Sequence, residues 1–244
     1  EFKNATSRYR GAEDLALDNL SADVKAGETL AIIGGTGSGK STLINLIPRL
    51  YDVNSGEVLV DGNDVRKYSL HDLHDKVAFV QQKAVLFKGT IRSNLLIGNP
   101  EATEEDMWKA LEIAQAKDFI SDLPDGLDAV VEQGGDNFSG GQKQRLAIAR
   151  AIIKPASIYV FDDSFSALDF KTDAKLRLAL RQDERISKAI IVIVAQRIST
   201  VTGADHIVVL DEGKVVGQGT HKELLADNTT YQEIVESQMK GAAI

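Results

Sequence analysis

The stretch that most constrains this chain runs from Gly34 to Ser41 and reads Gly-Gly-Thr-Gly-Ser-Gly-Lys-Ser. It fits the pattern G-x-x-x-x-G-K-[ST] of a phosphate-binding loop. The flanks agree, because Glu28–Ile33 is predicted as a buried strand and Thr42–Leu50 as the beginning of an apolar helix. Glycines permit positive φ, so the backbone N–H groups of the loop can turn toward one anion at the positive end of the helix dipole. The motif therefore predicts a phosphate site in an α/β core.

Two side chains of this loop have specific expected roles. Lys40 can reach the β- and γ-phosphates of a nucleotide, and the Ser41 hydroxyl can ligate Mg²⁺. The residues expected to contact the nucleotide are Gly34, Gly35, Thr36, Gly37, Ser38, Gly39, Lys40, Ser41 and Thr42. The alternative is a glycine-rich turn that binds nothing, and the flanking strand and helix argue against it.

Composition narrows the class of protein. The 244 residues include 28 Lys and Arg against 36 Asp and Glu, a net charge of -8 that disfavours a nucleic-acid partner. The chain has no cysteine, which excludes disulfides and thiolate metal sites. The longest apolar run is Ala189–Ala195, so we expect no membrane span. Glu1-Phe2-Lys3 reads as the middle of a strand, as in an excised domain, and no signal peptide is expected.

Strands and helices alternate along the rest of the chain. Strands are predicted at Leu15–Val24, Glu57–Val60, Val77–Val80, Ser157–Phe161, Ala189–Ala195, His206–Leu210 and Lys214–Val216. Helices are predicted at Thr103–Ala116, Asp118–Leu123, from Ser139 to before Pro155, Asp173–Glu184, Lys222–Leu225 and Thr230–Met239. Asp61-Gly62 and Asp211-Glu212-Gly213 are hairpin turns in this reading. The alternation predicts an α/β sheet, with a helical section set into its middle.

Two adjacent acidic residues, Asp162 and Asp163, stand at the carboxyl end of the strand predicted at Ser157–Phe161. Asp162 ends this strand, and the carboxyl end of a central parallel strand faces the crevice where ligands bind. With Ser41 it can hold Mg²⁺, directly or through water. Asp163 is placed where a general base would orient an attacking water. The alternative for Asp162 is a capping residue at a strand end.

A second anion-binding helix terminus is predicted at Ser139. Ser139 caps the long helix, and Gly140 and Gly141 expose its first N–H groups. One chain has one phosphate loop, so the natural use of this terminus is in trans, on a nucleotide held by another chain.

With Gln142 and Lys143-Gln144-Arg145 behind it, this segment resembles the signature of ATP-binding-cassette (ABC) proteins. The chain looks like the nucleotide-binding domain of an ABC exporter, and the resemblance covers roughly Phe2 to Met239. Gly34–Ser41 is then the Walker A loop and Ile158–Asp162 the Walker B strand. The resemblance also identifies a D-loop, which consists of Ser166, Ala167, Leu168 and Asp169.

Four further segments carry the resemblance. Tyr9 looks like the aromatic residue that stacks on adenine, and Gln82 resembles the Q-loop glutamine that reaches Mg²⁺ and the attacking water. Val131–Gly135 is similar to the exporter segment before the signature, and Leu86–Arg92 to the region that meets the membrane domains. Tyr9 as an ordinary surface aromatic and Gln82 as a strand-end cap stay open as alternatives.

The family resemblance implies a complete architecture. It implies a P-loop NTPase core with a mostly parallel sheet, an N-terminal antiparallel β subdomain and an inserted α-helical subdomain. Residues 1–82 and 155–244 would form the core, and about 83–154 the helical and signature part. ATP and Mg²⁺ are the implied cofactors. The implied partners are a second cassette, bound head to tail, and transmembrane domains near Gln82–Arg92, at the cytoplasmic face of the cell membrane. The domain itself is expected to be soluble.

Two departures from the family pattern fall on the hydrolytic residues. Asp163 stands where the family usually has Glu, and Gln196 stands in place of the switch histidine. The Asp carboxylate is shorter by about 1–1.5 Å, and a misplacement of about 1 Å can cost on the order of 10²-fold in rate. Gln196 can donate to a γ-phosphate but cannot carry a positive charge. None of the four histidines can replace it by position; they are His71, His74, His206 and His221.

These departures predict tight Mg·ATP binding with slow hydrolysis, while the intact signature serves the partner's site. The chain would then be the degenerate-site subunit of a heterodimeric, multidrug-type exporter. One alternative is a fully active ATPase of a homodimeric exporter, in which Asp163 and Gln196 are neutral variants. Another is a soluble ABC protein of DNA repair or translation, disfavoured by the acidic charge, the compact middle section and the single cassette. The signature argues against a P-loop kinase.

Overall fold

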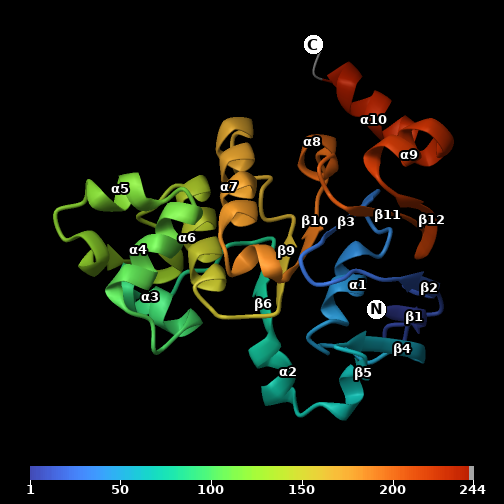
Figure 1. The fold of residues 1–244 in the computed structure, drawn as a ribbon, viewed down its shortest axis with the longest axis horizontal. Coiled ribbons are helices and arrows are strands. Elements are labelled where there is room, and N and C mark those ends of the chain that lie inside the picture. The colour runs from blue at the N-terminus through green and yellow to red at the C-terminus, as the bar shows by residue number, and fades with distance from the viewer. Residues whose placement is uncertain (242–244) are drawn as a thin grey trace. The chain divides into compact units, whose positions relative to one another are not determined.

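The computed structural model describes residues 1–241, which form two compact units. The first unit combines residues 1–77 with the described residues from 190 onward, and the second unit consists of residues 78–189. Each unit has its own sheet segments and its own helices (Figure 1).

Mostly parallel strands form the centre of the first unit. They are β3 (Thr29–Gly34), β10 (Ile190–Val194), β11 (His206–Asp211) and β12 (Lys214–Gly219), in the order β12-β11-β3-β10. β3 pairs in parallel with both β10 and β11, whereas β12 returns antiparallel to β11. The first five residues of β3 are buried, as expected for a strand covered on both faces. Helix α1 (Lys40–Asn45) follows β3 and contacts both β3 and β10.

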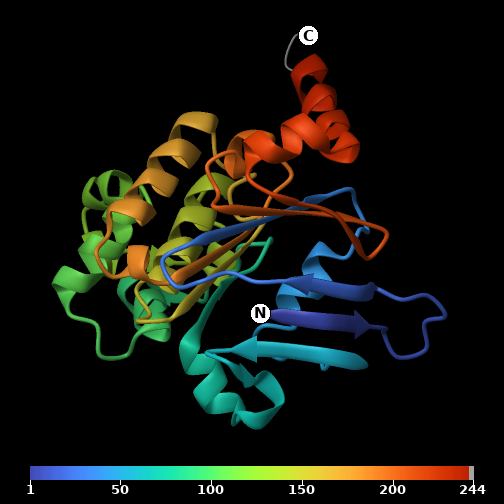
Figure 2. The ribbon, with the colours of Figure 1, turned by 45° about the vertical axis from the view of Figure 1, so that its right-hand side comes forward.

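An antiparallel sheet completes the strands of this unit. Its order is β2 (Leu17–Ala22), β1 (Phe2–Ser7), β4 (Ser55–Val60) and β5 (Asn63–Asp64), and Figure 2 shows its three long strands one above another. The Asp61-Gly62 turn joins β4 to β5, which confirms the predicted hairpin. A 3₁₀ helix, η1 (Val65–Lys67), and helix α2 (Leu70–Lys76) follow.

Three helices close the first unit. They are α8 (Ile198–Val201), α9 (His221–Asp227) and α10 (Thr229–Gly241). α10 contacts α8, α9 and β12. Tyr231 anchors its first turn: its side chain is fully buried, and its hydroxyl lies 2.8 Å from Nδ1 of His221.

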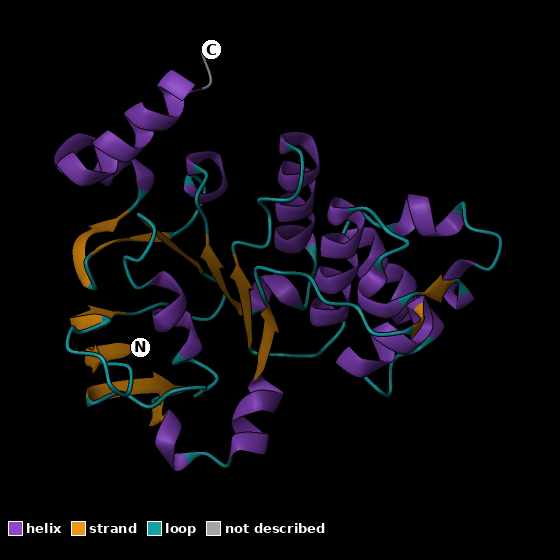
Figure 3. Cartoon of the chain, turned by 180° about the vertical axis from the view of Figure 1, so that it is seen from behind, coloured by secondary structure: helices purple, strands orange, loops and turns teal. Residues whose placement is uncertain are grey.

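The second unit is mainly helical, as the purple ribbons of Figure 3 show. Its helices are α3 (Ile91–Gly98), α4 (Glu104–Ile113), α5 (Lys117–Ser121), α6 (Gly140–Ile152) and α7 (Phe170–Gln182). Short 3₁₀ helices lie at η2 (Gly126–Asp128), η3 (Gln133–Gly135) and η4 (Ile186–Lys188). Its strands are β9 (Ile158–Asp162) beside β6 (Val77–Val80), and the short pair β7 (Gly89–Thr90) and β8 (Val130–Val131). α6 contacts α3 and α4.

Helix caps explain where these helices begin. Thr103 and Asp106 form the predicted capping box of α4. α7 begins at Phe170, three residues before the predicted Asp173, because the Asp169 side chain accepts from the backbone N–H of Thr172 and so caps an earlier turn. The short helices α3 and α8 were not predicted, since four to eight residues carry little periodicity.

The predicted fold class is confirmed: an α/β protein with a mostly parallel sheet, an antiparallel N-terminal β part and a helical insert. None of the helices within residues 1–241 has both the length and the apolar character needed to cross a membrane.

Arg185 ties the end of α6 to the beginning of β9. Its guanidinium donates to the carbonyl oxygens of Ile152 and Lys154, which α6 leaves without helical partners, and to the hydroxyl of Tyr159. The Tyr159 hydroxyl in turn donates to the Lys154 carbonyl at 2.6 Å. Burial raises the pKa of Tyr159, so this hydroxyl stays protonated. α6 carries the signature and β9 carries Asp162, so one side chain links two candidate functional elements.

We predict that Arg185→Ala lowers the free energy of unfolding by about 2–4 kcal/mol, because it removes the charged hydrogen bonds to the Ile152 and Lys154 carbonyls and to the Tyr159 hydroxyl. Equilibrium urea denaturation measures this change. Lys188→Ala, at an exposed residue whose partner is Glu184, is the control and should change stability by less than about 0.5 kcal/mol. Equal effects of the two substitutions would show that Arg185 is no such tie.

Candidate nucleotide-binding site

The phosphate-loop motif lies between the buried strand β3 and helix α1, as predicted. Gly37 and Gly39 have φ of 78° and 104°, values that favour glycine. A Cβ atom at Gly39 would lie 2.7 Å from the carbonyl oxygen of Ala16, and one at Gly34 would overlap the carbonyl oxygen of Leu210. Gly213 holds the loop from outside, since its N–H donates to the Ser38 carbonyl at 3.0 Å. Packing therefore requires glycine at positions 34 and 39, and backbone conformation favours it at positions 37 and 39.

The loop presents polar groups outward. Residues 35–37 are exposed, and the Ser41 residue at the start of α1 is exposed as well. The Lys40 ammonium lies 2.8 Å from the Gly34 carbonyl oxygen and 2.6 Å from that of Gly35, so it reaches back across the loop. A lysine in this position places its charge where the loop can surround an anion.

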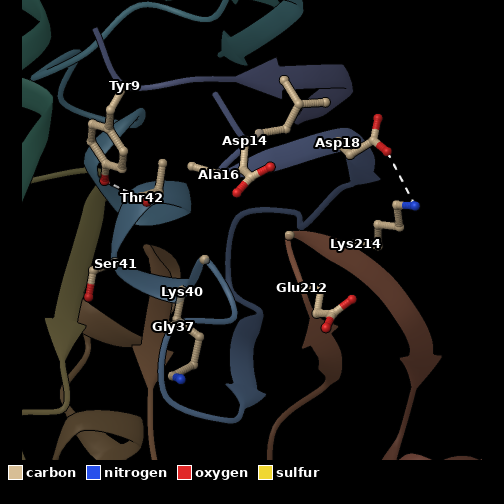
Figure 4. Close-up of a pocket in the computed structure, with 13 residues that line it drawn as sticks. Tyr9, Asp14, Ala16, Asp18, Gly37, Lys40, Ser41, Thr42, Glu212 and Lys214 are labelled. Carbon is tan, nitrogen blue, oxygen red and sulfur yellow. Dashed lines mark hydrogen bonds and ion pairs between the residues drawn. The ribbon is translucent and has the colours of Figure 1, made fainter. Parts of the chain in front are cut away.

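An open pocket of about 750 Å³ adjoins the loop. Its lining, drawn in Figure 4, includes Tyr9, Lys40, Ser41 and Thr42. The Tyr9 hydroxyl and the Thr42 hydroxyl are 2.6 Å apart, so the aromatic ring is connected directly to the first turn of α1. The pocket thus joins an aromatic side chain to the phosphate loop, which is what a nucleotide requires of a single site.

Tyr9 is held from a second side by a residue that the sequence analysis did not identify. The ring of Tyr51 meets the Tyr9 ring edge to face, with ring centroids 5.4 Å apart. The segment after Tyr51 is joined to the segment before Tyr9: the backbone N–H of Arg8 donates to Oδ1 of Asn54 at 2.7 Å. Tyr9 remains 42% exposed, so one part of the ring is available to a ligand. No local pattern signals Tyr51, because its contact spans 42 positions of sequence.

Gln196 lies at the same end of the sheet as the phosphate loop. Val194, the last residue of β10, is aligned with Ile32 of β3, and the N–H of Ala195 donates to the Ile32 carbonyl at 3.2 Å. Gln196 follows Ala195 and lies level with Gly34, the last residue of β3, where the phosphate loop begins. The parallel pairing of β10 with β3 therefore brings this predicted residue beside the loop, within the first unit.

The residues of the second unit that were predicted to act in hydrolysis, Gln82, Asp162 and Asp163, lie close to one another. Asp162 is the last residue of β9, and Asp163 follows with φ of 46° and only 7% exposure. Nε2 of Gln82 donates to Oδ2 of Asp163 at 3.2 Å, although 81 positions separate them. The D-loop begins directly behind, where the Ser166 hydroxyl donates to the Asp163 carbonyl at 3.0 Å.

The signature segment forms an exposed, capped helix start. The Ser139 hydroxyl accepts from the N–H of Gln142 at 3.2 Å, and Oε1 of Gln142 accepts from the N–H of Ser139 at 3.0 Å. A Cβ at Gly141 would lie 3.4 Å from the Ala167 carbonyl, so the signature and the D-loop are neighbours in this unit. Ser139 and Gly140 are exposed, which leaves the terminus open to another molecule.

The two histidines of α2, His71 and His74, each lie against an oxygen atom of another residue. Nε2 of His74 lies 2.9 Å from the Pro48 carbonyl, and Nε2 of His71 lies 3.3 Å from a carboxylate oxygen of Asp75. Within residues 1–241, no three His, Asp or Glu side chains gather as metal ligands.

The sequence pattern of the ABC transporter family matches residues 17–166, which is more than half of the chain. The chain belongs to the ABC transporter family.

Similar proteins place it among the exporter-type members. It is 51% identical to an uncharacterized ABC transporter ATP-binding protein of Mycobacterium tuberculosis (98% of this chain, 41% of that protein). It is 41% identical to an ATP-dependent lipid A-core flippase of Photobacterium profundum (96% of this chain, 40% of that protein). The structure of a bacterial Atm1-family ABC exporter with ATP bound superimposes with a TM-score of 0.92 at 36% identity, over 97% of this chain and 41% of that one.

The chain spans about two fifths of the length of the relatives it matches. It is therefore the ATP-binding domain of an exporter-type ABC transporter, and its fold is the ABC ATPase fold that the sequence predicted.

We predict that Gly39→Ala lowers the free energy of unfolding by about 1–3 kcal/mol, because alanine must adopt positive φ against the Ala16 carbonyl. It should also abolish ATP binding measured by calorimetry. Gly35→Ala is the matched control, since a Cβ there meets no atom within 4 Å, and it should shift stability by less than about 1 kcal/mol. Equal stability of the two variants would contradict this account of the loop.

Proposed function

We propose that this ABC domain binds Mg·ATP at the phosphate loop and pairs head to tail with a second cassette to power export across a membrane. The observation that carries the proposal is the loop itself: its glycine conformations, the inward Lys40 and the adjoining aromatic pocket form one nucleotide site. The similarity to a lipid A-core flippase and to an Atm1-family exporter supports the direction of transport.

Ser41, Asp162 and Gln82 are the residues proposed to hold Mg²⁺. Hydroxyl, carboxylate and amide oxygens are hard ligands of the kind that this ion prefers. A bound Mg²⁺ would neutralise charge that develops on the phosphates. Lys40 and the loop N–H groups would orient the β- and γ-phosphates, and Tyr9 would stack on the base.

The domain's own hydrolysis is proposed to be slow. The candidate base, Asp163, is one methylene shorter than Glu, and its carboxylate accepts a hydrogen bond from Gln82. Its backbone at φ 46° is fixed by the D-loop contact behind it. At the switch position, the Gln196 amide can donate a hydrogen bond to a γ-phosphate but supplies no charge. The groups proposed to bind the nucleotide are all present, while the two proposed to act in hydrolysis, Asp163 and Gln196, are weakened.

The partner is proposed to be a non-identical cassette with an intact catalytic pair, in a heterodimeric, multidrug-type exporter. Ser139, Gly140, Gly141 and Gln142 would contact the partner's ATP, since this helix start is exposed and correctly capped. The D-loop, from Ser166 to Asp169, adjoins it. The intact signature thus supports fast hydrolysis in the partner's site.

Transmembrane domains are proposed to dock near Gln82–Arg92, on the cytoplasmic face of the membrane. Val85 and Phe87 are exposed apolar residues of this segment. Arg150 supports them from α6, donating to the Val85 carbonyl at 2.8 Å with its guanidinium over the Phe87 ring. The core is proposed to consist of residues 1–82 and 155–244, and the helical and signature part of about 83–154.

We predict that Asp163→Glu combined with Gln196→His raises the steady-state ATPase rate of the domain by on the order of 10²-fold, since it restores reach and charge. Phosphate release under saturating Mg·ATP measures the rate. Asp118→Glu, an exposed residue of α5, is the control for an added methylene. An unchanged rate in the double variant, with ATP affinity retained, would refute the degenerate site and favour a fully active homodimeric ATPase.

We predict that Tyr9→Ala weakens ATP binding by about 5–100-fold, because a base–aromatic stack is lost, and leaves tripolyphosphate binding unchanged. Tyr51→Ala should weaken ATP binding by about 2–10-fold, through the lost edge-to-face contact. Calorimetric titration measures both ligands. Phe87→Ala, an exposed aromatic that does not line this pocket, should alter neither affinity. Equal losses for ATP and tripolyphosphate would show that Tyr9 does not contact the base.

A further inference from the structure

The last helix of the described chain holds the backbone of the switch segment. Oε1 of Gln238, on α10, accepts from the N–H of Ile198 at 2.8 Å, and its Nε2 donates to the carbonyl oxygen of Gln196. The two bonds bracket Arg197, so one amide side chain fixes both peptide groups of the turn between β10 and α8. The residue so held, Gln196, is the candidate γ-phosphate contact.

These bonds satisfy groups that the local structure leaves open. The N–H of Ile198 is the first of α8 and has no intrahelical acceptor. Arg197, at the N-cap, has a side chain that can only donate, so it cannot cap this N–H. The acceptor comes instead from Gln238, 40 positions later in the sequence. α10 therefore supplies the acceptor for the Ile198 N–H and a donor for the Gln196 carbonyl.

α10 is itself anchored at its other end. The buried Tyr231 side chain bonds to His221, and the Tyr231 N–H donates to Oδ1 of Asn228 at 2.8 Å. Nε2 of Gln232 donates to the Leu225 carbonyl at 2.8 Å and to that of Ala226 at 3.3 Å. Gln232 and Gln238 thus lie on one helix and each makes two hydrogen bonds, but only those of Gln238 reach the switch segment.

The backbone of Gln196 sets the point from which its side chain extends. Gln196 leaves β10 beside β3, where that strand enters the phosphate loop. A displacement of about 1 Å in a group that contacts a reacting phosphate is enough to weaken the contact strongly. Without Gln238, the Gln196 carbonyl and the Ile198 N–H would bond to water, and the turn would lose this constraint.

We propose that Gln238 is a positioning residue, which fixes the Gln196 backbone so that the Gln196 amide reaches the γ-phosphate of bound nucleotide. The inference rests on the proposed role of Gln196. It makes the C-terminal helix α10 part of the machinery that distinguishes ATP from ADP, although α10 does not line the pocket.

The test is the ratio of the ADP and ATP dissociation constants, measured with Mg²⁺ by calorimetry, a readout that does not need hydrolysis. Gln196→Ala should lower the preference for ATP by about tenfold or more. Gln238→Ala should lower it by about three- to tenfold, through the same contact. Gln196→Ala with Gln238→Ala should fall no further than Gln196→Ala alone, because the two residues act in series.

Two more variants separate positioning from stability. Gln232→Ala removes the same number of side-chain hydrogen bonds from the same helix, and it should leave the ratio within about twofold of the parent. Gln238→Glu keeps the acceptor for Ile198 but loses the donor for Gln196, so its ratio should lie between those of the parent and Gln238→Ala. Urea denaturation of each variant checks that the first unit is folded.

The outcomes are distinguishable. If Gln196→Ala lowers the preference for ATP while folded Gln238→Ala and Gln238→Glu keep the parent ratio, the inference is overturned and the proposed function stands. If Gln232→Ala lowers the ratio as much as Gln238→Ala, α10 acts only through general stability, and the inference is again overturned. If Gln196→Ala itself leaves the ratio unchanged, the proposed γ-phosphate contact fails, and the positioning role fails with it.

Discussion

The structure depends on the parallel pairing of β3 with β10 on one side and β11 on the other. This pairing buries β3 and places Gly34 at the carboxyl end of the strand, where the phosphate loop begins. The same register sets Gln196 beside the loop. At Gly39, the packing against the Ala16 carbonyl leaves no room for a side chain. The phosphate-binding loop thus follows from backbone geometry, and the proposal that binding is retained while hydrolysis is slow depends on this independence from side chains.

In the proposed function, binding and turnover therefore depend on different parts of the domain. The loop, Lys40 and Tyr9 would hold the nucleotide through backbone N–H groups, one charge and one ring. Turnover would depend on side-chain reach at Asp163 and Gln196, and each of these is embedded in further contacts. Asp163 is bonded to Gln82, and the Gln196 backbone is bonded to Gln238. The proposal therefore expects substitution at Asp163 and Gln196 to change the rate of hydrolysis while the fold and the pocket remain intact.

Much of this could be predicted from the sequence, because the signals were local. The loop, the Asp61-Gly62 hairpin and the Thr103 capping box each need only neighbouring residues, and each was confirmed. The Tyr51–Tyr9 and Gln238–Gln196 contacts span about forty positions, and nothing in their neighbourhoods indicates them. The earlier beginning of α7 was missed since a single capping side chain, Asp169, outweighed the apolar periodicity.

The most direct test is a single-turnover measurement on mixed pairs. One chain is this domain, and the other is its Asp163→Glu, Gln196→His variant, with a different tag, so that pairs of defined composition can be purified after trapping with ATP and Mg²⁺. The account predicts prompt release of one phosphate per mixed pair, and loss of that release when Ser139 of the unmodified chain is changed to Ala. Prompt release of two phosphates per mixed pair, or brisk hydrolysis by pairs of the unmodified chain alone, would contradict it.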